Sequence, residues 1–174
     1  CSTTAEWTLQ TAVNLCYANG KILFVTNDKG IVTLNAETLK IESTKVDFTS
    51  SNDSTNITGI SYNPVTNQYV VSYKSNKSYI FDNKCKLVAT LNKNTTHSTL
   101  EYQSTTSNSN YIYQTFGKDG TYATTINVFD WNGNFITSLD INTKDSTNKL
   151  GDSDSGSVQA VFEFNEKIYL LVLQ

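Results

Sequence analysis

The chain has 174 residues and a formal net charge of −3, and its length allows one domain with its own core. Arginine and methionine are absent, and the 13 basic residues form no block, which excludes the clustered cations typical of nucleic-acid and anionic-lipid binding. No run of about 18 apolar residues occurs, so no transmembrane helix is predicted.

Alternating apolar residues between tight turns predict β-strands along the whole chain. A short strand is expected at residues 6–10, and a first set of four strands follows between Ala12 and Phe48. The first turn of this set is Asn19-Gly20, because both residue types tolerate a positive φ. The fourth strand of the set is expected at residues 41–48.

Two further sets of four strands and one half-set follow, and they open at Ile57, Ser98 and Ser157. The second set turns at Asn63-Pro64, where proline fixes φ. The third has a tight Asn132-Gly133 turn before its last strand, and the half-set turns at Asn165-Glu166. No segment has the length and periodicity of a helix.

The sets repeat with a period of about 40–60 residues, which is typical of four-stranded propeller blades. The third strand of the second and third sets ends in Phe81-Asp82 and Phe129-Asp130, and the first set has Leu34-Asn35 at this point. This Phe-Asp motif before a turn resembles the blades of six-bladed NHL-type propellers and of exported bacterial lipoproteins. The resemblance implies an all-β fold with about 3.5–4 antiparallel blades, in one domain of residues 6–174.

The blade count departs from the family, because propellers typically have four to eight blades. Three explanations stay open: the chain is part of a longer protein, a second chain brings the ring to about seven blades, or the repeats form a barrel or sandwich. The strand at residues 6–10 is a candidate to complete the last blade. A partner strand could complete it instead, by pairing with its open edge.

The first residue, Cys1, stands before Ser2, Thr3 and Thr4, and this start resembles a mature bacterial lipoprotein. The resemblance implies a lipid anchor on Cys1, a tether of residues 1–5 and a place outside the cell or on its surface. In an exported protein Cys16 and Cys85 are candidates for a disulfide. Two separate thiols are the alternative.

Propellers bind ligands at the mouth of the central channel, and by this analogy the mouth loops carry four candidate binding residues: Asp28, Lys74, His97 and Asp119. A second loop contains Asp152 and Asp154 between glycines, which resembles half of a calcium loop because it gathers several carboxylate oxygens. No cofactor is predicted apart from calcium, for which this loop is the candidate site. The single histidine excludes a histidine-rich zinc site.

The expected function is that of a non-catalytic binding or interaction module, with a protein or a carbohydrate as ligand, recognised by loops on a rigid sheet scaffold. Trp7, Trp131 and the ten tyrosines could stack on sugar rings. Two alternatives stay open: a metal-dependent hydrolase or lactonase of the six-bladed type, and a structural subunit completed by a partner strand.

Overall fold

The computed structural model describes residues 12–26, 31–43, 48, 57–75, 77–91, 101–118, 121–122, 125–140 and 157–173. Within these ranges the chain consists of β-strands and turns, without a helix. Every strand pair is antiparallel. The predicted all-β class is confirmed.

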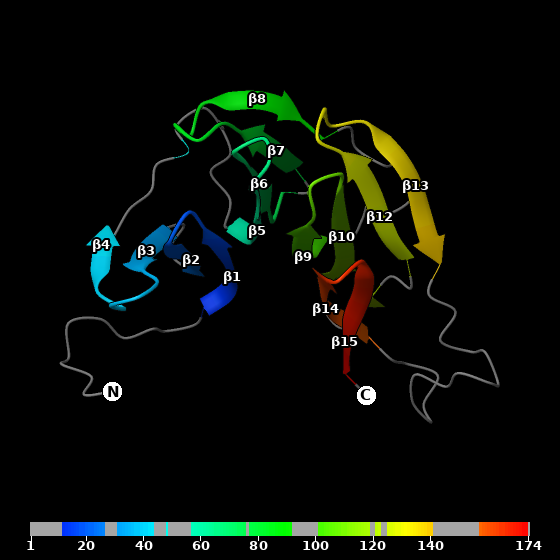
Figure 1. Cartoon of the computed structure of the whole chain (residues 1–174). Coiled ribbons are helices and arrows are strands. Elements are labelled where there is room, and N and C mark those ends of the chain that lie inside the picture. Colours follow the sequence, from blue (N-terminus) through cyan, green and yellow to red (C-terminus); the bar gives the residue numbers. More distant parts are fainter. Residues whose placement is uncertain are drawn as a thin grey trace.

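The strands form four sheets, called here blades 1 to 4 (Figure 1). Blade 1 consists of β1 (Ala12–Ala18), β2 (Lys21–Thr26), β3 (Ile31–Asn35) and β4 (Ile41–Ser43). Blade 2 consists of β5 (Ile57–Asn63), β6 (Gln68–Tyr73), β7 (Lys77–Phe81) and β8 (Leu87–Thr90). Blade 3 consists of β9 (Glu101–Ser107), β10 (Tyr111–Lys118), β12 (Thr125–Asp130) and β13 (Phe135–Asp140), with β11 (Thr121–Tyr122) beside the end of β10. Blade 4 consists of β14 (Ser157–Phe164) and β15 (Lys167–Leu173).

The predicted sets therefore correspond to the blades, and the first strand of each blade lies nearest the centre of the arc (Figure 1). One detail differs from the prediction. The fourth strand of the first set ends at Ser43 among the described residues, and Phe48 is buried outside any strand.

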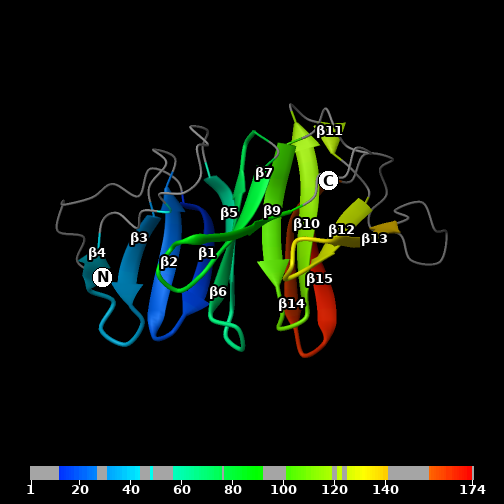
Figure 2. The same ribbon diagram turned by 90° about the horizontal axis from the view of Figure 1, so that it is seen from above.

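The turn residues show why the chain reverses where it does. Asn19 and Gly20 have φ values of 49° and 77°, and Asn165 and Glu166 have values of 50° and 62°. Two positive φ values in succession form the turn that matches the twist of a β-hairpin. The hairpins between the first and second strands of all four blades lie along one edge of the molecule (Figure 2).

The Phe-Asp motif caps the turn between the third and fourth strands. Oδ1 of Asp82 accepts hydrogen bonds from the amides two and four residues later, at 2.8 and 2.9 Å. Oδ1 of Asp130 accepts the same pair at 2.9 and 2.8 Å. In blade 1 Asn35 accepts from the amides two and three residues later, at 3.1 and 2.9 Å. The motif thus folds a turn, which explains why blades 2 and 3 share it and why Asn35 takes the place of the aspartate in blade 1.

The first strands share a second irregularity. Each is interrupted by a register shift, or β-bulge, just before four equivalent residues: Asn14, Gly59, Ser104 and Ala160. Their spacing lies within the predicted period of about 40–60 residues. These positions carry small or polar side chains, and at Gly59 a Cβ would lie 2.9 Å from the Cβ of Thr105 on the next blade. The shared bulge therefore gives a common numbering for the four blades.

Separate apolar clusters hold successive blades together. Blades 1 and 2 enclose Leu23, Val25, Ile60 and Phe81. Blades 2 and 3 enclose a second cluster around Phe129 and Leu91, and blades 3 and 4 a third around Val161. This face-to-face order of sheets around a centre is that of propeller blades, so the barrel and sandwich alternatives do not describe the arrangement.

Candidate functional site

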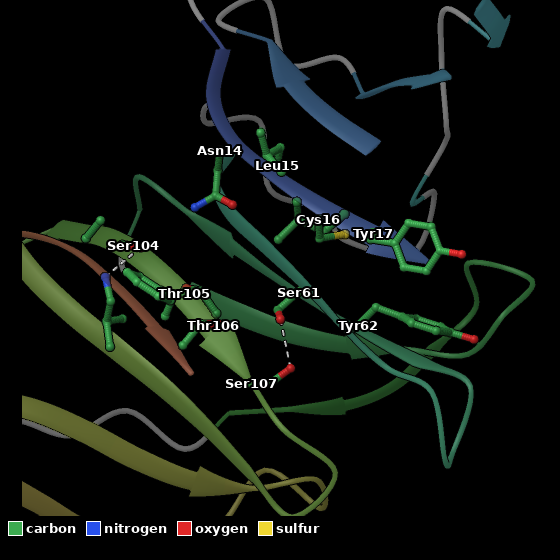
Figure 3. Close-up of a pocket in the computed structure, with 14 residues that line it drawn as sticks. Asn14, Leu15, Cys16, Tyr17, Ser61, Tyr62, Ser104, Thr105, Thr106 and Ser107 are labelled. Carbon is green, nitrogen blue, oxygen red and sulfur yellow. Dashed lines mark hydrogen bonds between the residues drawn. The ribbon is translucent and has the colours of Figure 1, made fainter. Parts of the chain in front are cut away.

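A cavity of about 530 Å³ lies where the first strands of the four blades meet (Figure 3). The described residues that line it belong to β1, β5, β9 and β14. A volume of this size falls in the range of sites for small organic ligands. The site is thus built on strands of four different blades.

Hydroxyl groups dominate the lining on one side. Strand β9 contributes four successive residues, Ser104 to Ser107. The Oγ atoms of Ser61 and Ser107 lie 2.8 Å apart and join β5 to β9 (Figure 3). Ser104 Oγ accepts a hydrogen bond from the Val161 amide at 3.4 Å and so joins β9 to β14. A hydroxyl both donates and accepts, so these groups have capacity left for a ligand.

Among the described residues that line the cavity there is no acidic side chain, lysine or histidine. Tyr62, at its edge, is held by two short contacts: its hydroxyl accepts from Asn19 Nδ2 at 2.6 Å and donates to Asn67 Oδ1 at 2.7 Å. The described part of the lining is therefore neutral, and it offers no countercharge to an ion.

Cys16 also lines the cavity, and burial raises the pKa of its thiol to about 12. The thiol stays protonated near neutral pH, where only the thiolate is a strong nucleophile. No disulfide joins Cys16 to Cys85 in the structure. Both cysteines lie near Tyr69. The pKa of the Tyr69 phenol is raised to about 12, mainly by burial and further by Tyr62 and the two cysteines.

Most of the predicted site residues lie outside the described residues: Cys1, Asp28, His97, Asp119, Asp152 and Asp154, together with Trp7. Lys74 is described. It is exposed in the turn between β6 and β7 and does not line the cavity. Among the described residues no three of the His, Cys, Asp and Glu side chains gather as metal ligands would. In the same part of the chain no helix is long and apolar enough to cross a membrane.

The structure differs from the sequence-based predictions about ligand contacts in two respects. Trp131 is buried, and its Nε1 donates to the Asn108 carbonyl at 2.9 Å, so its ring offers no surface for stacking. The hydroxyl row of β9 was missed. Its signal is the Ser-Thr-Thr-Ser run of residues 104–107, which is unusual in the first strand of a blade because both faces become polar.

No family model and no curated protein matches the chain. Solved structures do resemble it. The computationally designed protein Ika4 is 12% identical with a TM-score of 0.57, over 97% of this chain and 95% of that one. The WD40 repeats of RRP9 are 11% identical with a TM-score of 0.57, over 86% of this chain and 41% of that one.

Hydrazine synthase from Kuenenia stuttgartiensis is 9% identical with a TM-score of 0.56, over 92% of this chain and 41% of that one. The chain thus spans about two fifths of the RRP9 and hydrazine synthase chains. At such identities the likeness shows the fold alone. It confirms propeller-like blades, although the Gly-His and Trp-Asp signatures of WD40 repeats are missing from this sequence.

Proposed function

We propose that the chain is a non-catalytic binding module whose central cavity takes a neutral, hydroxyl-rich ligand of the carbohydrate class. One observation carries the proposal: four strands from four blades surround a cavity of about 530 Å³, and the polar side chains described in its lining are hydroxyls, one amide and one thiol rather than charged groups. The side chains that contact the ligand would be held in place by rigid strands, which lowers the entropic cost of binding.

The chemistry of the lining favours a sugar over an ionic ligand. The hydroxyls of Ser61, Thr106 and Ser107 and the amide of Asn14 offer donors and acceptors side by side. A sugar presents the same mixture on adjacent carbons. A carboxylate or phosphate would lose its hydration and gain no cation in return.

Isothermal titration calorimetry with a panel of neutral oligosaccharides tests the cavity. We expect at least one to bind, and Thr106→Val to weaken that binding at least tenfold, because valine keeps the shape and removes the hydroxyl. The matched control is Thr137→Val, an exposed threonine on β13 outside the cavity. The proposal fails if no neutral saccharide binds, or if both variants bind as the parent does.

A further inference from the structure

The two end blades each expose an apolar sheet face. On blade 1 the side chains of Leu15 and Tyr17 are 59% and 65% exposed. On blade 4 those of Phe162, Phe164 and Leu171 are 51%, 60% and 53% exposed. Contiguous exposed apolar groups of this kind mark interaction surfaces.

The strand register shows that these residues form two continuous faces. Opposed residues on neighbouring strands share a face. The blade 1 open face consists of Leu15 and Tyr17 on β1 and of the residues opposite them on β2, which are Phe24 and Ile22. The blade 4 open face is defined in the same way: it consists of Phe162, Phe164 and Leu171 and of the residues opposite them, which are Tyr169, Lys167 and Ala160. The rings of Phe162 and Tyr169 stack with centroids 4.9 Å apart and planes inclined by 7°.

The internal blades show what covers such faces. Counted from the shared bulge, Leu15 and Tyr17 are the counterparts of Ile60 and Tyr62. Ile60 and Tyr62 are buried in the cluster between blades 1 and 2. The blade 1 open face is thus the face that, in blade 2, packs on the preceding blade.

The same count applies to the other end. Phe162 and Phe164 are the counterparts of Cys16 and Ala18, which are buried in the cluster between blades 1 and 2. The blade 4 open face is therefore the face that, in blade 1, packs on the following blade. The two open faces are therefore the two sides of one blade-to-blade contact. Within one chain they do not meet, so the side chains of both faces stay exposed.

We propose that a second copy of this chain covers both faces. Blade 4 of each copy packs on blade 1 of the other, and a two-fold axis generates both contacts. Because every copy supplies one face of each kind, a pair satisfies all four faces and closes the ring, as a two-fold assembly requires. Leu15 and Tyr17 of one open face and Phe162 of the other also line the cavity, so the cavities of the two copies would then join in one central channel.

Sedimentation velocity on the 174-residue chain tests the assembly, because the monomer has a mass of 19.3 kDa. We expect twice that mass. Two variants then test the contact: Phe162→Asp with Phe164→Asp makes blade 4 acidic, and Leu15→Lys with Tyr17→Lys makes blade 1 basic. Each variant alone should sediment as a monomer, since both of its contacts now bury unpaired charge.

Mixing the two variants should restore the dimer. In the mixed pair one contact joins an acidic face to a basic face, and the other joins two unaltered apolar faces. A dimer formed by contact of like faces would not be restored in this way. Val65→Lys is the control for added charge, because Val65 is exposed in the turn between β5 and β6, on neither open face.

Hydrogen exchange of the unaltered chain provides a readout that needs no variant. We expect amides of β1, β2, β14 and β15 to exchange faster after dilution to the monomer. A chain that stays monomeric at every concentration overturns the proposal, and so does a dimer that survives both sets of substitutions. The proposal does not rest on the carbohydrate site, because mass and exchange are measured without a ligand.

Discussion

Cys85 and Gly133 occupy the same position in successive blades, and both have a positive φ, of 60° and 87°. Each amide donates to the carbonyl of the capping aspartate three residues earlier, at 3.0 and 3.1 Å. In blade 1 Leu39 holds the corresponding position with a φ of 56°. The turn thus places a residue in the left-handed backbone conformation in each of the three blades. Only blade 3 has glycine there, the residue that adopts this conformation without steric cost.

Replacing Gly133 with alanine should destabilise the fold by about 2–4 kcal/mol. About 1 kcal/mol comes from the left-handed backbone, and the rest from a Cβ only 2.6 Å from the Thr90 carbonyl oxygen of the neighbouring blade. Gly20→Ala is the matched control, because Gly20 has a φ of 77° and open space around it. Urea denaturation should show the larger loss for Gly133→Ala, and equal losses would contradict the proposed close contact.

The capping aspartates predict a loss of stability in acid. The Lys86 and Lys84 amides lower the pKa of Asp82 despite some desolvation. At Asp130 desolvation raises the pKa, but hydrogen bonds from Asn134 and Asn132 outweigh it, so the pKa is lowered. Carboxyls with a lowered folded pKa stabilise the protein above the unfolded value of about 3.9, and this contribution disappears as the pH falls through the folded pKa.

The double variant Asp82→Asn with Asp130→Asn should therefore lose less stability than the parent between neutral pH and about pH 3, because asparagine keeps the accepting oxygen and does not titrate. Asn35 already plays this part in blade 1. Asp130→Ala removes both backbone hydrogen bonds and should cost about 1 kcal/mol at neutral pH. Urea midpoints across the pH range measure both effects, and parallel curves for parent and double variant would exclude the titration.

A buried polar network joins blades 2 and 3 beside the cavity. Gln114 Nε2 donates to the Oγ atoms of Ser72 and Ser78 at 2.7 and 2.8 Å, and Ser72 Oγ lies 2.6 Å from Thr105 Oγ1. Gln114→Leu should destabilise the fold by about 1–3 kcal/mol, since it leaves buried hydroxyls with fewer partners. The half-buried Gln68 offers the control Gln68→Leu. Similar unfolding midpoints for the two variants would show that the network adds no stability.

The thiol of Cys16 should react slowly while the protein is folded. Burial raises its pKa to about 12, so almost none of it is thiolate at pH 8. In a Cys1→Ser, Cys85→Ser background, a disulfide reagent should modify Cys16 only as urea unfolds the chain. The converse background, Cys1→Ser with Cys16→Ser, reports on the partly exposed Cys85 and should react faster. Immediate modification of Cys16 in the native protein would contradict its burial.

The sequence was enough to predict the strands and turns because their chemistry is local. Asn19, Gly20 and Asn165 are residue types that tolerate a positive φ, and alternating apolar residues need only one buried face. The Phe-Asp motif was recognised as a repeat, but its role as a cap became visible only in the contacts of Asp82 and Asp130.

The cavity could not be predicted in the same way. Its hydroxyls lie in a strand. The analogy with other propellers instead predicts charged residues in loops, such as Asp28 and His97, and these lie outside the described residues. Which of the residues 104–107 faces a neighbouring blade depends on the bulge before Ser104 and on contacts with distant residues. Ser61 on β5 lies 46 positions from Ser107, and Val161 on β14 lies 57 positions from Ser104. Trp131 shows the same limit, because only the packed fold reveals that its ring is covered.

The separate apolar clusters have a mechanical consequence. Among the described residues the cluster between blades 1 and 2 is the most extensive. In the cluster between blades 3 and 4 the last blade contributes one buried residue, Val161, and the partly buried Ile168 and Leu170. In a linear array each unit depends only on its immediate neighbours. A pulling force or a mild denaturant would therefore peel the terminal hairpin away before the remaining sheets separate, and the molecule would yield stepwise from its carboxyl end.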